Sequence, residues 1–336
     1  FLANNQVSLA INVRPDRSRI LALAPRPGWD LRFLAQAAQA EPRIELSVVY
    51  PSAQGPVFAD SLVSWQDPGI SDSWGQWDGM VLIGWQGLAA SIDWVKLEEA
   101  VKEGLGLLVL PANQAANQRS VAPPPAGLAK LLPVTADQYR WLEGPFFGSI
   151  PTGNAGHPVL HLVAGGAARG LDASVDQGLA SLPPLRQIIG VASRPGALDL
   201  VEGMQKGPDG ISLPLLVLGN LEQGRVIWFG GQRLWELAFW EPGIRSPGAG
   251  QESPQAARRL LQNLLVWLAA GQEESGLVFA GRRPFYQEGE RITLGAQWRD
   301  MRGQPVQDRD LALILRNLDA SDQADQDRTF APVSYT

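Results

Sequence analysis

The chain has 336 residues, of which 45% are hydrophobic and 18% are charged, and its formal net charge is -6. No run of basic residues is present that would neutralise a phosphate backbone, so the composition argues against nucleic acid as a partner. Because the sequence has no cysteine and only two histidines, it excludes disulfides, Cys-containing zinc sites and imidazole-rich metal sites. We therefore expect no metal and no cofactor.

The longest apolar runs, such as 213–218 and 264–270, are far shorter than the roughly 20 residues that a membrane-spanning helix needs. The sequence begins with Phe1 and shows no signal-peptide pattern at its start. We expect the chain to be a piece of a longer protein, with any signal or membrane anchor outside it.

The first elements in chain order are strands. Alternating apolar residues over 6–13 are typical of the last strand of a preceding β unit. Short apolar runs separated by helical stretches then indicate a parallel sheet with helices on both faces. The expected strands lie at 20–24, 44–49, 80–83 and 107–110.

Three helices are predicted from apolar periodicity. The first has an apolar stripe, and the second begins at Ser91 as N-cap and ends at Gly104. The third begins at Ser253-Pro254 and should be buried, with Gly271 as its C-cap. The stripe of the first helix is Leu31, Leu34, Ala35 and Ala38, and that of the third is Leu260, Leu261, Leu264, Leu265 and Leu268.

The rest of the chain gives weaker signals. Residues 112–212 are rich in Pro, Gly and Ala, and we expect loops and irregular strands laid over one end of the sheet. Strands at 215–218 and 226–229 should form a hairpin-like pair. Beyond residue 276, alternation of apolar and polar residues suggests part of a small antiparallel sandwich. The expected organisation is a terminal strand at 1–16, an α/β domain at 17–274 and an Ig-like β-sandwich segment at 275–336.

Four stretches together resemble a known family. They are RILALAPRPGWDLRFL at 19–34, WDGMVLIG at 77–84, VKEGLGLLVL at 101–110 and GRVIWFGG at 224–231. These stretches are similar to the class I glutamine amidotransferase-like domains of large bacterial membrane proteins, which also carry von Willebrand A and β-sandwich modules. The resemblance covers about residues 19–272 and implies a flavodoxin-like, three-layer parallel sheet.

The resemblance also implies where a catalytic triad would lie. Class I amidotransferases use a Cys at a strand-to-helix elbow and a His-x-Glu pair after a later strand. Here the elbow corresponds to Pro111-Ala112-Asn113-Gln114 and the pair to Gly230-Gly231-Gln232. Neither place offers a thiol, a serine or an imidazole, so we expect no enzyme of this kind.

The remaining polar candidates are at the expected carboxyl ends of the strands. Open α/β sheets bind ligands there, so Arg26, Asp30, Asn113 and Gln114 are the candidate ligand-binding residues. The alternative is that Pro27 and Gly28 only shape a turn, that Asp30 favours the helix N-terminus and that Trp29 packs.

Other motifs have similarly open interpretations. His157 and His161 lack a carboxylate nearby in sequence, so ordinary structural roles are favoured over metal binding. The glycine-rich stretch 164–170 is no Walker A loop, and the acidic stretch 319–327 lacks EF-hand spacing. A group of tryptophans either packs in the core or forms a platform for a partner or a sugar. Its members are Trp65, Trp74, Trp77, Trp85 and Trp94.

The leading hypothesis is a non-catalytic interaction or scaffolding module in the extracytoplasmic part of a bacterial envelope protein, with a protein as its partner. The location is implied by the resemblance alone. The alternative is a small-ligand-binding domain or a hydrolase-type enzyme that uses the carboxyl ends of the sheet strands. The two hypotheses predict different geometries. A scaffolding module should have no open pocket at the carboxyl ends of the strands, whereas a ligand-binding domain or an enzyme should have a pocket there with converging polar groups.

Overall fold

The protein is represented by a computed structural model of the whole chain. It describes residues 17–53, 55–65, 74–85, 92–112, 121–136, 139–152, 154–162, 179, 182–206, 210, 212–238, 253–270, 276–280, 295–299, 314–315 and 328–329. The chain divides into two compact units, Phe1–Glu273 and Glu274–Thr336. The strand expected at 6–13, Ser91 and Gly271 lie outside the described residues, as do the stretches 164–170 and 319–327.

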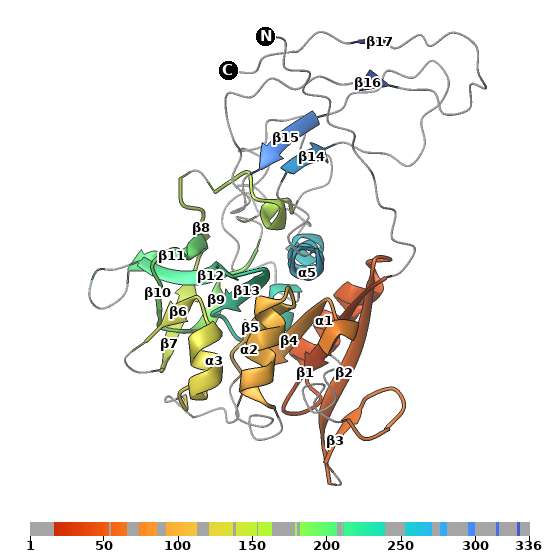
Figure 1. Cartoon of the computed structure of the whole chain (residues 1–336). Helices are drawn as coiled ribbons and strands as arrows, with labels where there is room; N and C mark the ends of the chain where they lie inside the picture. The colour runs from red at the N-terminus through yellow and green to blue at the C-terminus, as the bar shows by residue number, and fades with distance from the viewer. Residues whose placement is uncertain are drawn as a thin grey trace, which may run out of the picture. The chain divides into compact units, whose positions relative to one another are not determined.

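A mixed, mostly parallel sheet forms the centre of the first unit (Figure 1). Its five central strands are parallel, and antiparallel strands extend it at both edges. The order is β3 (Gly55–Phe58), β2 (Ile44–Ser52), β1 (Ser18–Leu23), β4 (Gly79–Ile83), β5 (Gly106–Leu110), β13 (Gly224–Phe229), β12 (Ser212–Leu221), β11 (Leu198–Lys206) and β8 (Gly148–Ser149). The expected strands at 20–24, 44–49, 80–83 and 107–110 are thereby confirmed, with small differences at their ends.

The pleat of the strands divides the core between two faces. In β5, Leu108 and Leu110 lie in one buried cluster, and Leu107 and Val109 lie in the other. Successive side chains of a strand point to opposite faces, so a strand with helices on both sides must be apolar at every position. This explains the uninterrupted run GLLVL, in which every residue is buried.

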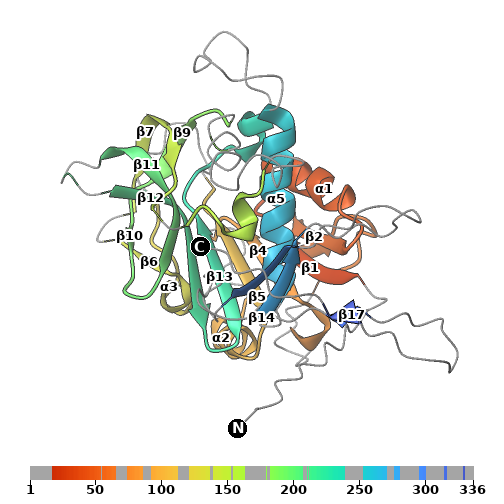
Figure 2. The same ribbon diagram turned by 90° about the horizontal axis from the view of Figure 1, so that it is seen from above.

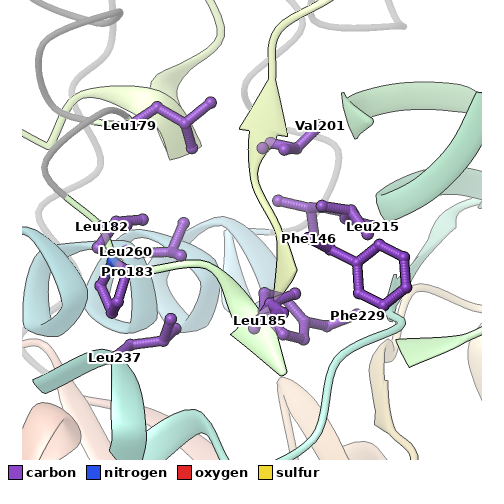
Figure 3. A pocket seen from close by; sticks show the side chains of 12 residues that line it. Phe146, Leu179, Leu182, Pro183, Leu185, Val201, Leu215, Phe229, Leu237 and Leu260 are labelled. Atoms are coloured by element: carbon purple, nitrogen blue, oxygen red, sulfur yellow. The ribbon is translucent and has the colours of Figure 1, made fainter. Parts of the chain in front are cut away.

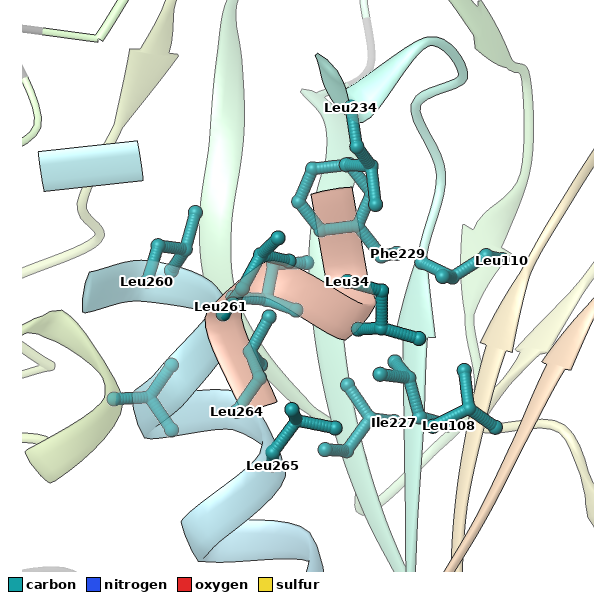
Figure 4. Close-up of a cluster of buried hydrophobic side chains, with 14 of the residues drawn as sticks. Leu34, Leu108, Leu110, Ile227, Phe229, Leu234, Leu260, Leu261, Leu264 and Leu265 are labelled. Atoms are coloured by element: carbon teal, nitrogen blue, oxygen red, sulfur yellow. The ribbon is translucent and has the colours of Figure 1, made fainter. Parts of the chain in front are cut away.

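One face is covered by two helices, α1 (Trp29–Gln39) and α5 (Ser253–Ala269), which lie beside each other (Figure 2). All five leucines of the predicted α5 stripe are at most 4% exposed, which confirms the prediction of a buried helix (Figure 4). Gly106 allows this close packing, because a Cβ there would lie 2.2 Å from the carbonyl oxygen of Leu268.

The other face is covered by α2 (Trp94–Lys102) and α3 (Ala126–Leu131). The N-cap of α2 is Asp93, whose carboxylate accepts hydrogen bonds from the backbone N–H groups of Val95 at 3.0 Å and Lys96 at 3.2 Å. The prediction of Ser91 as N-cap is therefore wrong, because the helix begins two residues later. Gly104 follows the helix with φ of 124°, as predicted for its end.

Two further predictions need correction. The strands expected at 215–218 and 226–229 are longer than predicted, and a turn at Glu222 and Gln223 joins β12 directly to β13. The segment 112–212 is more regular than expected, since β11 belongs to the main sheet itself. It also contains α3 and the antiparallel pairs β6 (Val134–Thr135) with β10 (Ala192–Ser193) and β7 (Trp141–Phe146) with β9 (Leu185–Ile189).

In the second unit the described residues form two antiparallel pairs. Strand β14 (Gly276–Ala280) pairs with β15 (Gly295–Arg299), and β16 (Ile314–Leu315) pairs with β17 (Arg328–Thr329). Among the helices that the structure describes, none combines the length and the hydropathy that crossing a bilayer requires.

Candidate functional site

The carboxyl ends of the parallel strands meet at one end of the sheet. Strand β1 is followed by the turn 24–28, β4 by Gly84 and Trp85, β5 by Pro111 and Ala112, and β13 by residues 230–233. Because β1, β4, β5 and β13 are consecutive neighbours in the sheet, these four segments form one surface. This is the place where an open α/β sheet binds its ligands.

At the end of β5, where the resemblance implies a nucleophile, the described side chains are apolar. Pro111 is buried, and Ala112 packs against the core on the α1 and α5 face. The backbone N–H of Gly84 donates to the carbonyl of Leu110 at 2.7 Å. A Cβ on Gly84 would lie 2.9 Å from the Cβ of Ala112 and 3.7 Å from Cγ of Pro25. The segments that follow β1, β4 and β5 therefore touch one another here.

Aromatic side chains fill the other side of this end. Trp85 is 2% exposed, and its indole N–H donates to the carbonyl of Ala122 at 2.9 Å. Its ring lies 6.2 Å from that of Trp228 and 6.1 Å from that of Tyr139, between ring centroids. Burial raises the pKa of the Tyr139 hydroxyl, and the charge of Arg194 acts in the opposite direction. Both the ordinary value near 10 and a raised value leave the Tyr139 hydroxyl protonated at physiological pH.

The candidate residues Arg26 and Asp30 occupy different environments. Arg26 is exposed in the turn after β1, and it forms no ion pair with another described residue. Asp30 is half-buried, and its carboxylate accepts a hydrogen bond from the backbone N–H of Trp235 at 3.3 Å. Asn113 and Gln114 lie outside the described residues. Asp30 is thus engaged with the start of the 3-10 helix η6 (Leu234–Ala238).

Burial raises the pKa of the Asp30 carboxyl above its ordinary 3.8. Backbone hydrogen bonds from Trp235, Leu234 and Arg233, and then the charge of Arg233, act in the opposite direction. Through these hydrogen bonds the carboxyl links the N-terminus of α1 to the start of η6. The contacts of Asp30 are thus of a structural kind.

At the three residues after β13 where the resemblance implies a His-x-Glu pair, Gly230, Gly231 and Gln232, there is no carboxylate and no imidazole. Gly231 forms an isolated bridge with Ile188, and the backbone N–H of Gln232 donates to the carbonyl of Gln187 at 3.3 Å. Gln232 is 7% exposed, so its amide lies largely inside the protein.

The two histidines are apart from this surface. His157 is 3% exposed and caps the 3-10 helix η4 (Pro158–Leu160), where its Nδ1 accepts from the backbone N–H of Val159 at 3.3 Å. Its ring lies 5.6 Å from that of Trp267, whereas His161 is exposed. Within the described part of the chain, no three His, Cys, Asp or Glu side chains are grouped so that they would hold a metal ion.

A pocket lies between the sheet, η6 and α5 (Figure 3). Its volume is about 50 Å³, which is room for roughly three to five water-sized spheres. Twelve residues line it, all of them apolar or glycine, among them Phe146, Val201, Phe229 and Leu260. The lining side chains include no titratable or nucleophilic group.

Of the two interpretations of the tryptophan group, packing in the core is the one that the structure supports. Trp65, Trp74 and Trp85 are at most 6% exposed, and Trp77 and Trp94 are partly buried against the same core cluster. In contrast, Trp29, which was expected to pack in its turn, is 57% exposed. Its ring lies 6.1 Å from that of Trp235. Nothing local in the sequence indicates this pairing, because the two residues come from distant parts of the chain.

The sheet and its helices define the chain as an α/β protein. No family model and no curated protein matches it. Among solved structures, it is similar to the cytoplasmic protein STM3548 from Salmonella typhimurium, with 16% identity and a TM-score of 0.47 over 75% of this chain and 98% of that chain.

Two further structures are similar to a smaller degree. The cytoplasmic protein STM1381 from Salmonella typhimurium LT2 has 15% identity and a TM-score of 0.45 over 74% of this chain and 99% of that one. A cold-adapted beta-galactosidase from Rahnella sp. R3 has 11% identity and a TM-score of 0.39 over 75% of this chain and 32% of that one.

Proposed function

We propose that this chain is a non-catalytic interaction or scaffolding module. Its first unit is a flavodoxin-like domain of the class I glutamine amidotransferase-like kind without the Cys-His-Glu triad, and its second unit is an Ig-like β-sandwich segment. The module belongs to the extracytoplasmic part of a bacterial envelope protein and binds another protein. Its location and family rest on the resemblance of the sequence stretches described above.

The strand order supports the flavodoxin-like assignment. When the five parallel strands are numbered along the chain, β2, β1, β4, β5 and β13 have the order 2-1-3-4-5. This is the order of the flavodoxin-like doubly wound sheet, which binds its ligand where the order reverses, between the first and third strands. Here those strands are β1 and β4, which precede Pro25 and Gly84.

The observation that carries the proposal is the contact between Ala112 and Gly84. A nucleophile at the end of β5 needs a thiol or hydroxyl with open space in front of it. Ala112 has neither group, and it faces a glycine on which a Cβ would lie only 2.9 Å away. The candidate acid at this end of the sheet, Asp30, is hydrogen-bonded to η6.

A turnover assay on the full chain tests the proposal. We expect no release of ammonia from L-glutamine and no hydrolysis of p-nitrophenyl acetate above the buffer rate. The hydrolase alternative predicts a saturable rate that falls in Arg26→Ala and persists in Arg19→Ala. Arg19 is a matched control because it is an exposed arginine at the opposite end of β1. A saturable rate with that pattern would overturn the proposal.

A further inference from the structure

The surface at the N-terminus of α1 exposes an aromatic ring among arginines. We define the Trp29 patch as Arg26, Trp29, Arg32, Arg186, Arg233 and Trp235. Trp29 is the one aromatic residue among the exposed large hydrophobic residues of the described chain. The guanidinium carbon of Arg32 lies 5.3 Å from the centroid of Trp29, and that of Arg233 lies 5.3 Å from the centroid of Trp235.

The patch is positively charged, although the whole chain has a net charge of -6. Among the described residues, its four arginines are accompanied by the carboxylates of Asp30 and Glu236, both of which have partners. Glu236 pairs with Arg233 at 2.5 Å and with Arg186 at 3.4 Å. Arg26 and Arg32 have no carboxylate partner among the described residues. The excess positive charge is thus concentrated on these two arginines, which precede and follow Trp29.

The position of Arg32 over the Trp29 ring suits it to bind a carboxylate. A guanidinium over an indole ring is held by the ring's electrons, and the N–H donors at its edge remain available. Because the side chain is already ordered, less conformational entropy is lost when those donors bind. The protein contains an example of such recognition, since the Glu236 carboxylate lies between two guanidinium groups of the same patch.

We propose that the Trp29 patch binds an acidic peptide segment of a partner protein. Carboxylates of the segment pair with Arg26 and Arg32, and an apolar side chain of the segment covers the exposed part of Trp29. Tryptophan and arginine are the residues that contribute most binding energy in protein interfaces, and arginine clusters recognise acidic motifs. The inference rests on the proposed function, because it assigns the binding surface of the interaction module.

The test is fluorescence anisotropy with two fluorescein-labelled peptides and the full chain. The first peptide alternates glutamate with leucine, and the second has glutamine in place of each glutamate. We expect at least tenfold tighter binding of the glutamate peptide, with an affinity that falls as salt is added because the pairs are exposed. Equal affinity for both peptides, or no binding of either, overturns the inference.

Variants of the Trp29 patch show whether the glutamate peptide binds there. Arg32→Glu and Trp29→Ala should each weaken binding of the glutamate peptide at least tenfold, and Arg32→Lys should have an intermediate effect because it keeps the charge without the planar fork. Arg19→Glu makes the same charge change at the opposite end of β1 and should leave the affinity within about twofold, since screening limits the effect of a distant exposed charge. An equal loss in Arg32→Glu and Arg19→Glu would show only an effect of net charge and would overturn the inference.

Binding to lipid vesicles distinguishes a patch that binds an acidic peptide from one that binds a membrane surface. If vesicles of phosphatidylglycerol bind in a manner that depends on Trp29 and Arg32 and the glutamate peptide does not bind, the patch recognises a membrane and the inference is overturned. Thermal unfolding of each variant establishes that it is folded. Failure of peptide binding without any turnover overturns this inference alone, whereas turnover of glutamine or ester overturns the proposed function.

Discussion

The carboxylate of Asp30 accepts a hydrogen bond from the backbone N–H of Trp235 at 3.3 Å, across 205 residues of sequence. This bond joins the first turn of α1 to the start of η6. Trp29 directly precedes Asp30, Trp235 carries the bonded N–H, and the two indole rings lie 6.1 Å apart. The half-buried Asp30 therefore positions both rings of the Trp29 patch.

Two substitutions of Asp30 distinguish the effect of its hydrogen-bonding oxygen from the effect of its charge. Asp30→Ala leaves the backbone N–H groups at the start of η6 without their acceptor, and we expect a loss of about 1–3 kcal/mol in the free energy of unfolding. Asp30→Asn keeps an oxygen in place and should cost much less. Urea denaturation of the two variants measures the difference, and equal losses would show that the acceptor oxygen is not what matters.

The raised pKa of Asp30 gives a prediction for pH dependence. Burial favours the protonated form in the folded state, so the corresponding stability is fully present below the unfolded pKa of 3.8 and is lost as pH rises through the folded value. Asp30→Asn does not titrate. The difference in free energy of unfolding, variant minus wild type, should therefore increase as pH rises from 3.8 to neutrality. A difference that is constant over this range would contradict the assigned shift.

Local periodicity predicted the parts of the fold in which burial depends on neighbours in sequence. The leucine stripe of α5 repeats with the period of a helix, and the runs of β4 and β5 are short and apolar at every position, as in a strand buried on both faces, so their buried positions were predictable. The ends of β12 were not, because Gly219 to Leu221 pair with β13 through backbone hydrogen bonds that apolar patterning does not report.

The candidate site was less predictable for a different reason. Arg26 and Asp30 follow β1 as expected, but the partner of Asp30 is a backbone N–H group that any sequence would supply. The exposure of Trp29 likewise depends on where Trp235 and α1 meet, which is a tertiary relationship. The close approach of Ala112 and Gly84 is a contact between two loops, and neither small residue is conspicuous in sequence.

The cap of α2 gives a direct test of a corrected prediction. Ser91 and Asp93 are both good capping residues, so their side chains alone do not decide between them. In the structure the Asp93 carboxylate accepts hydrogen bonds from two backbone N–H groups of the first turn. Asp93→Ala should lower the free energy of unfolding by about 0.5–2 kcal/mol, and Ser91→Ala should have a smaller effect. Chemical denaturation of both variants checks the order, and a larger loss for Ser91→Ala would restore the earlier interpretation.

Gly84→Ala tests the contact between the loops that follow β4 and β5. Gly84 has φ of 66°, and an added Cβ would lie 2.9 Å from that of Ala112. We expect a loss of at least about 1–3 kcal/mol from the backbone conformation alone, with a further loss from the contact. Gly196→Ala is the matched control, because Gly196 has a similar φ of 85° but nothing lies within 4 Å of its added Cβ.

A double variant isolates the contact itself. Ala112→Gly removes the methyl group that the new Cβ would meet, so Gly84→Ala combined with Ala112→Gly should recover the part of the loss that exceeds Gly196→Ala. This recovery is a coupling energy and follows from a double-mutant cycle on thermal or urea unfolding. If the two substitutions are additive, Gly84 and Ala112 are not in contact in solution.

Leu264→Ala tests the core under α5. Leu264 is fully buried in the cluster on the α1 face of the sheet (Figure 4). Removing its side chain loses the transfer free energy of the buried groups and leaves a cavity, so we expect a loss of about 2–5 kcal/mol. Leu62→Ala makes the same chemical change at a side chain that is 67% exposed and should cost far less. Urea denaturation measures both, and similar losses would mean that α5 does not pack on the sheet as described.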